Sequence, residues 1–305
     1  MEFTDPYEID IPAGTRHVGE GPFWTPGETV IWSFRRFDFD RDHAEVRRPM
    51  RVIEDSPSGA VLWMAGGTAT TDTRIVGWEG SDPHDVPLQE RFRPLAEAPR
   101  RINAPGTWRG LGVLKIVPAR VPFSVWVLLK PGVSGNVSSA AGAARGMSDD
   151  AVRADWYVNL EATHRRTDGV LYTSDHILDI TFPVDTEPLH APSAHVVSEP
   201  TSSGHTTSAY TTSGDAPLNP NGAVFKDVDE LAAAANFGAW PREWSDIIRS
   251  NGSQLLDNLG EFTWAFDPRW EVRARELVAE SAASDSSRNQ EHRPIRAGCY
   301  SKDRI

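Results

Sequence analysis

Acidic and amide side chains gather in three segments whose spacing suits metal-assisted phosphate chemistry. The segments are residues 154–161 (ADWYVNLE), 175–180 (DHILDI) and 224–231 (VFKDVDEL). The oxygen-bearing side chains that could converge are Asn159, Asp175, Asp179, Asp227, Asp229 and Glu230. Unpaired carboxylates repel one another when they converge, and a hard divalent cation relieves that repulsion. Oxygen donors favour Mg²⁺, Mn²⁺ or Ca²⁺ over structural zinc, and such cations bridge phosphate oxygens and activate water.

Strand alternation predicts which of these side chains share a face, because successive residues of a strand point to opposite sides. In the first segment, Trp156, Val158 and Leu160 point one way, and Tyr157, Asn159 and Glu161 point the other way. In the second, His176, Leu178 and Ile180 lie opposite Asp175, Ile177 and Asp179. The connection contains Gly169, which favours a hairpin. That hairpin would place the amide and both aspartates on one face.

The same residues have other interpretations that spacing alone leaves open. Asp227 and Asp229 precede a predicted helix, where acidic side chains favour the N-terminus. Asp175 and Asp179 also fit solvated residues of a strand edge, and Asn159 alone fits a surface amide.

The elements that must position these residues are mostly short strands. Segments rich in Val, Ile and Trp, bounded by Gly, Pro or Asp, predict strands over 28–34, 51–54, 60–64, 74–78, 108–117, 123–129, 155–160 and 175–182. No helical pattern alternates with them, so we expect an antiparallel barrel or sandwich rather than a parallel sheet. The later sequence predicts helices over 229–237, closed by Gly238, and over 241–259.

Composition excludes several classes of protein. Lys and Arg number 31 against 43 Asp and Glu, so the net charge is 31 − 43 = −12, and we expect no nucleic-acid partner. No apolar run approaches the ~18–20 residues of a membrane helix, and the first residues lack a secretory pattern, so we expect a cytoplasmic protein without membrane contact. The single cysteine, Cys299, excludes an internal disulfide. Dinucleotide-binding, P-loop, nucleophile-elbow and HExxH motifs are missing.

Two segments are too polar to form a core. Residues 131–150 predict a flexible loop, and the Ser-, Thr- and Pro-rich residues 186–221 predict a disordered insertion. We therefore expect a single domain over 1–275 and a polar C-terminal tail over 276–305, frayed after Glu280.

The motif segments resemble the FomD-like nucleoside diphosphatase family, which includes bacterial nucleoside di- and triphosphatases and a cytidylyl-phosphonate hydrolase. The matching stretches are residues 156–161 (WYVNLE), 165–167 (RRT), 173–179 (TSDHILD) and 226–231 (KDVDEL). The resemblance implies an α+β, mainly β fold, with a twisted antiparallel β-barrel followed by C-terminal helices. It also implies a divalent-metal-dependent hydrolase that cleaves a phosphoanhydride bond in nucleoside di- or triphosphates or in a nucleotidyl-phosphonate conjugate.

The resemblance also assigns roles to residues. It implies one or two Mg²⁺ or Mn²⁺ ions on Asn159, Asp175, Asp179, Asp227 and Glu230. Independently of the resemblance, strand alternation places Tyr157 on the face of Asn159, where it would hydrogen-bond a phosphoryl oxygen or the leaving group, and Lys226, next to the acidic pair, would balance developing charge. Arg165 and Arg166 are candidates for binding the substrate's phosphate groups, with plain surface charge as the alternative.

Two positions depart from the family pattern. Ile177 stands where the family's run of aspartates has its middle carboxylate, and Val30 stands where some members have an arginine that donates a proton. Two other functions stay open: a non-catalytic nucleotide- or metal-binding module, and a pathway-specific biosynthetic hydrolase. The sequence identifies neither the base nor the leaving group, and it leaves the oligomeric state open.

Overall fold

The computed structural model describes residues 2–35, 45–81, 83–132, 152–182 and 222–291, with side chains described up to residue 283. The predicted insertion over 186–221 lies outside the described residues, as does the predicted loop over 131–150 apart from its first two positions. In the described part of the chain, no helix has the length and apolar character that crossing a membrane requires.

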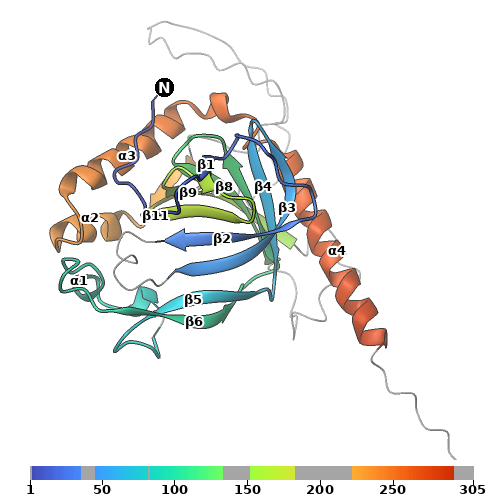
Figure 1. Cartoon of the computed structure of the whole chain (residues 1–305), viewed down its shortest axis with the longest axis horizontal. Coiled ribbons are helices and arrows are strands. Elements are labelled where there is room, and N and C mark those ends of the chain that lie inside the picture. The colour runs from blue at the N-terminus through green and yellow to red at the C-terminus, as the bar shows by residue number, and fades with distance from the viewer. Residues whose placement is uncertain (1, 36–44, 82, 133–151, 183–221, 292–305) are drawn as a thin grey trace, which may run out of the picture.

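A 12-stranded sheet forms most of the described fold (Figure 1). Its strands are β1 (Arg16–His17), β2 (Thr29–Arg35), β3 (Val46–Ser56), β4 (Gly59–Ala65), β5 (Ala69–Ile75), β6 (Arg101–Thr107), β7 (Gly112–Pro118), β8 (Phe123–Pro131), β9 (Val152–Glu161), β10 (Arg165–Arg166), β11 (Val170–Thr181) and β12 (Val224–Lys226). All pairs are antiparallel except β2 with β11. Because β2 pairs with both β11 and β3, the path β11–β9–β8–β7–β4–β3–β2 returns to β11.

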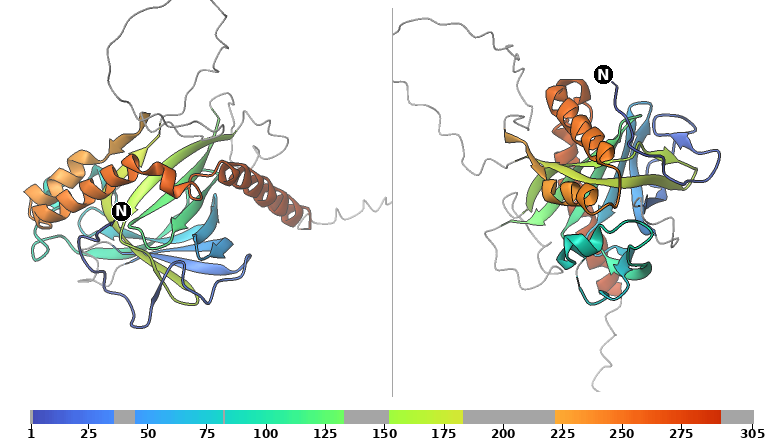
Figure 2. Two further views of the ribbon diagram at one scale, coloured as in Figure 1. Left: turned by 90° about the horizontal axis from the view of Figure 1, so that it is seen from above. Right: turned by 90° about the vertical axis from the view of Figure 1, so that its left-hand side faces the viewer.

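Helices follow the strands in the sequence and lie along one side of the sheet (Figure 2). They are α2 (Val228–Asn236), α3 (Arg242–Asp257), the 3-10 turn η4 (Leu259–Phe262) and α4 (Arg269–Glu291). The short η1 (Pro83–Asp85) and α1 (Leu88–Arg91) lie between β5 and β6. The predicted mainly β, α+β class with antiparallel strands and C-terminal helices is confirmed.

The differences from the predicted elements have local causes. The prediction lacks β6, whose sequence RINAPGT contains a proline and a glycine, both poor signals for a strand. The helix α4 continues to Glu291, beyond Glu280, where the sequence predicted a frayed polar tail. That helix also crosses residue 276, the predicted start of the tail.

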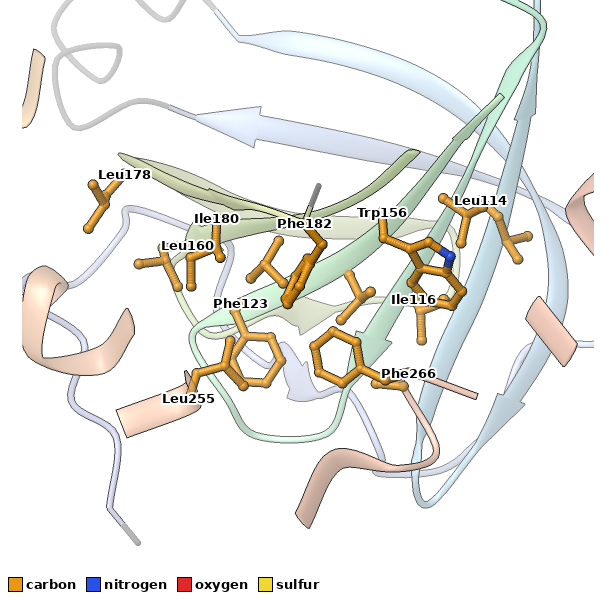
Figure 3. Packing of buried hydrophobic residues seen from close by; sticks show 14 of the residues in the cluster. Leu114, Ile116, Phe123, Trp156, Leu160, Leu178, Ile180, Phe182, Leu255 and Phe266 are labelled. Atoms are coloured by element: carbon orange, nitrogen blue, oxygen red, sulfur yellow. The ribbon is translucent and has the colours of Figure 1, made fainter. Parts of the chain in front are cut away.

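Two hydrophobic clusters lie on opposite faces of the sheet. Alternate residues of β4 divide between them: Val61 and Trp63 belong to the first cluster, and Leu62 and Met64 to the second. The first cluster joins the sheet to the helices, as Phe123, Leu160, Ile180, Phe182, Leu255 and Phe266 show in Figure 3. The second cluster is rich in tryptophan. Burial on both faces explains why the central strands read as nearly continuous apolar runs.

Candidate active site

An irregularity in β11 brings Asp175 and Asp179 closer together than a regular strand would. Asp175 lies opposite Glu161 of β9, Asp179 lies opposite Asn159, and the register shifts between these two pairs. The advance of four residues from Asp175 to Asp179 on β11 therefore lies opposite an advance of only two residues, from Glu161 to Asn159, on β9. At about 3.3 Å per residue, this shortens a separation of about 13 Å to about 7 Å. The negative charge of Asp175 consequently acts on Asp179.

Ile177 lies at the centre of this irregularity. Its φ is 70°, in the left-handed region, and its backbone N–H donates a hydrogen bond to Asp175 Oδ1 at 2.8 Å. Alternation predicted that Ile177 shares a face with the two aspartates, and the structure differs. Ile177 packs in the first hydrophobic cluster with Leu178 and Ile180, because a bulge interrupts the period of the strand.

Asp179 is the most enclosed aspartate of the site, with 5% of its surface exposed. Its Oδ2 accepts a hydrogen bond from the Tyr157 hydroxyl and lies 3.7 Å from Lys226 Nζ. Its Oδ1 is buried and has no hydrogen-bond partner among the described residues. Burial, and then the charge of Asp175, hold the pKa of Asp179 well above its usual range.

Tyr157 remains protonated beside this carboxylate. Burial raises the pKa of its phenol, and the negative charge of Asp179 raises it further. The hydroxyl therefore acts as a hydrogen-bond donor rather than as a base.

The short strand β12 adds a cation and a third carboxylate. Lys226 lies opposite Asp179, and its Nζ is 2.6 Å from Asp227 Oδ2. Burial alone would lower the pKa of Lys226, but the hydrogen bond to Asp227 and the charge of Asp179 raise it overall. Asp227 precedes α2, yet its side chain makes no capping hydrogen bond. Asp227 therefore contacts Lys226 instead of capping the helix, which was the other interpretation that the sequence left open. Asp229 is exposed in the first turn of α2.

Glu230 is directed to a different partner. Its carboxylate forms an ion pair with Arg91 of α1 and lies 3.6 Å from His84 Nδ1. Burial alone would raise the pKa of Glu230, but hydrogen bonds from His84 and Arg91 lower it to about 2. Its charge is therefore already balanced by the segment between β5 and β6.

The donor chemistry of the site fits a hard divalent cation. As they stand, no three carboxylate, imidazole or thiol side chains in the described ranges form a complete metal site. Asp179 nevertheless offers an unpartnered buried oxygen, a second carboxylate raises its pKa, and the amide of Asn159 lies on the adjacent strand. These are the oxygen donors that Mg²⁺ and Mn²⁺ prefer. Glu230 would first have to leave Arg91.

A buried ion pair that the sequence analysis missed lies near the aspartates. Lys115 of β7 pairs with Glu161 of β9, and its Nζ donates a hydrogen bond to Ser124 Oγ at 2.7 Å. Burial lowers the pKa of Lys115 to about 8, although Glu161 partly offsets the effect. Burial alone would raise the pKa of Glu161, but Lys115 and then His164 lower it to about 2. The available signal was one lysine in an otherwise apolar strand, GVLKIVP.

Tryptophan rings surround the cations on this face of the sheet. The Lys115 ammonium lies 4.4 Å from the ring centroid of Trp32 and 5.1 Å from that of Trp126. The half-buried Arg48 lies 5.0 Å from Trp32 and 5.2 Å from Trp108. The charge of Asp175 acts on both cations. Cations, aromatic rings and carboxylates therefore share one region.

The two arginines predicted to bind phosphate have other partners. Arg166 is fully buried, forms an ion pair with Asp55 and lies 3.7 Å from the ring centroid of Trp24. Arg165 donates a hydrogen bond to Thr15 O at 2.9 Å and lines a cavity of 740 Å³ beside the N-terminal segment. Neither arginine is placed with the aspartates.

The position of the missing proton donor is part of the core. Val30 is 1% exposed and belongs to the second hydrophobic cluster. A different strand register would bring Arg35 or Arg36 to this position. Arg35, at the end of β2, forms an ion pair with Glu45 at 3.1 Å, and Arg36 lies outside the described residues.

Comparisons with known proteins support the resemblance seen in the motifs. No family model matches the chain. A cytidylyl-2-hydroxypropylphosphonate hydrolase of Streptomyces fradiae is 26% identical over 225 residues, which are 73% of this chain and 74% of the relative. A second, from Streptomyces wedmorensis, is 26% identical over 158 residues, covering 52% of this chain and 59% of the relative.

A solved structure supports the similarity of fold. The phosphatase SC4828, solved with the non-hydrolysable nucleotide GPCP, matches 81% of this chain and 86% of its own, with a TM-score of 0.53 and 22% identity. Together these matches confirm that the chain is similar to the FomD-like proteins.

Proposed function

We propose, from its similarity to the FomD-like hydrolases, that this chain hydrolyses a phosphoanhydride bond in a nucleotide, either a nucleotidyl-phosphonate conjugate or a nucleoside di- or triphosphate. The observation that carries the proposal is the meeting of Asp175, Asp179 and Asn159 across the irregular part of β9 and β11. Curated relatives are named for hydrolysis of a cytidylyl phosphonate. The closed path of paired strands supports the barrel that the family resemblance implies.

The reaction is a displacement at phosphorus. A water oxygen forms a bond to phosphorus, the anhydride P–O bond breaks, and the leaving phosphate or phosphonate departs with the electron pair. The proton of the water passes to the leaving group or to solvent. The main task of the protein is to position the groups and to balance the negative charge that develops.

A divalent cation would be held by Asn159, Asp175, Asp179 and Asp227. A bound cation polarises phosphoryl oxygens and lowers the pKa of water. The raised pKa of Asp179 and its unpartnered oxygen support this assignment.

The residues around the aspartates would act on the substrate directly. Tyr157, kept protonated by its surroundings, donates its one proton to Asp179 and would donate it to the substrate once a cation engages that carboxylate, and Lys226 supplies positive charge beside Asp179. The half-buried Arg48 favours anionic substrates in the same region, and the half-buried Trp108 beside it offers a flat apolar surface for a nucleobase.

The test is turnover of a substrate panel by the purified chain. Nucleoside di- and triphosphates and CMP conjugates are incubated with Mn²⁺ or Mg²⁺, with an EDTA control, and released phosphate and nucleotides are measured. We expect turnover that EDTA abolishes and that Asp179→Ala lowers at least 100-fold, an effect on the order seen for loss of a key electrostatic group. Asp229→Ala is the matched control, because that exposed carboxylate should leave turnover unchanged.

A binding module without turnover is the second candidate. Val30 and Ile177, which replace two polar residues of the family pattern, are both buried among apolar side chains. Mn²⁺ and nucleotide binding without hydrolysis of any panel member would favour this second function.

A further inference from the structure

The N-terminal segment crosses the fold next to the part of β11 that carries the aspartates. Thr4 exchanges backbone hydrogen bonds with the Asn251 side chain of α3, at 2.8 Å and 3.4 Å. Asp5 Oδ1 accepts a hydrogen bond from the backbone N–H of Thr163 at 2.9 Å. These contacts tie the segment to α3 and to the connection between β9 and β10 before it reaches Tyr7.

Tyr7 contacts the residue where the register shift begins. Its hydroxyl donates a hydrogen bond to the backbone oxygen of Asp175 at 3.1 Å, and it lies 2.9 Å from Ser174 Oγ. Because the phenol has one proton, Ser174 is then the donor in the second contact.

Aromatic contacts hold the ring of Tyr7 in place. Its centroid lies 4.6 Å from that of Trp244 and 5.4 Å from that of His176, which it meets edge-on. His176 is fully buried, and Trp244 belongs to α3. The hydroxyl is therefore presented to the backbone of β11 by a fixed ring.

The backbone at this point needs an external contact. The ladder between β9 and β11 is interrupted between Asp175 and Asp179, and Ile177 adopts φ 70°, which is unfavourable for a β-branched residue. Strained backbone persists only where surrounding contacts hold it. Tyr7 supplies such a contact from 168 residues away in the sequence.

We propose that Tyr7 is a positioning residue that holds the Asp175 backbone so that the carboxylates of Asp175 and Asp179 converge for cation binding. This inference rests on the proposed function, because the experiment measures the binding of a cation at the proposed site.

The experiment measures Mn²⁺ affinity by titration calorimetry on the full chain. Tyr7→Phe keeps the ring and removes only the hydroxyl. A neutral hydrogen bond corresponds to about a threefold to tenfold change in affinity, so we expect Mn²⁺ to bind about three- to tenfold more weakly. A merely structural role would lower the unfolding temperature and leave the Mn²⁺ affinity of the folded protein unchanged.

Tyr172→Phe is the matched control, since it removes a hydroxyl from β11 itself, and its Mn²⁺ affinity should equal that of the wild type. Ser174→Ala should weaken Mn²⁺ binding less than Tyr7→Phe, and the double variant should be no weaker than Tyr7→Phe alone, because both act through one contact. If Tyr7→Phe fails to fold, Ser174→Ala carries the test by itself.

Unchanged Mn²⁺ affinity in Tyr7→Phe, or in Ser174→Ala where that variant carries the test, would overturn the inference while leaving the proposed function intact. Wild-type protein that neither binds Mn²⁺ nor turns over the panel would overturn both, and the two failures are thus distinguishable.

Discussion

The hydroxyl of Tyr157 donates a hydrogen bond to the carboxylate of Asp179 from a diagonal position across β9 and β11. Tyr157 lies opposite Thr181, and Asp179 lies opposite Asn159, so the two side chains are diagonal neighbours on the same face. The contact joins the most buried aspartate of the site to a phenol that stays protonated.

Removing this donor should slow the reaction more than it weakens binding. For Tyr157→Phe we expect kcat to fall about 100-fold, the scale for losing one preorganised hydrogen-bond donor, with a smaller change in KM. Steady-state kinetics on the best substrate of the panel measure both constants. An unchanged kcat would remove Tyr157 from the mechanism.

A divalent cation should stabilise the folded protein, because it relieves the repulsion between Asp175 and Asp179. A cation at about 100 times its Kd adds about 2.7 kcal/mol to the free energy of unfolding. We expect Mn²⁺ to raise the unfolding temperature and EDTA to reverse the effect. Asp179→Asn should lose the shift, whereas Asp229→Asn should keep it; equal shifts in both variants would place the cation elsewhere.

The buried pair of Lys115 and Glu161 should behave as a unit. Lys115→Met leaves the Glu161 carboxylate buried without its partner, and we expect the variant to lose about 3–5 kcal/mol of unfolding free energy. The double variant Lys115→Met with Glu161→Met should lose less than the single variant. Urea denaturation measures the unfolding free energy of Lys115→Met, Glu161→Met and the double variant. A loss in the double variant equal to the sum of the two single losses would show that the pair is not coupled.

The contributions of His176, Glu161 and Glu230 to stability should be lost as the pH falls from about 6.5 towards 2. Burial lowers the pKa of His176 from 6.5 to about 4, so between these values the unfolded chain binds a proton that the folded chain does not. Glu161 and Glu230, with pKa values of about 2 against 4.5, extend the loss below pH 4.5 for the same reason.

Urea denaturation at a series of pH values tests this dependence. We expect His176→Phe to flatten the part of the curve between pH 6.5 and 4 and to leave the part below 4.5 in place. A His176→Phe curve that runs parallel to the wild-type curve from pH 6.5 to 4 would contradict the buried, neutral histidine; the comparison needs the variant because the raised pKa of Asp179 acts in the opposite sense in this range.

The sequence was sufficient where a local period decides the outcome. Alternation along β9 correctly separated Trp156, Val158 and Leu160, which pack in the first cluster, from Tyr157, which packs against the second. The same period failed at Ile177, because a bulge is set by how two strands pair and not by the residues of one strand.

The partners of the charged residues depended on the tertiary structure. Glu230 matches a ligand position of the family motif, yet it forms an ion pair with Arg91 of α1, and Lys115 pairs with Glu161 across 46 residues of sequence. The sequence by itself determined the strand-then-helix order and the candidate oxygen donors, since residue type and period are local properties. Only the tertiary structure decided which charges meet, because burial and pairing depend on strands that are distant in sequence closing against one another.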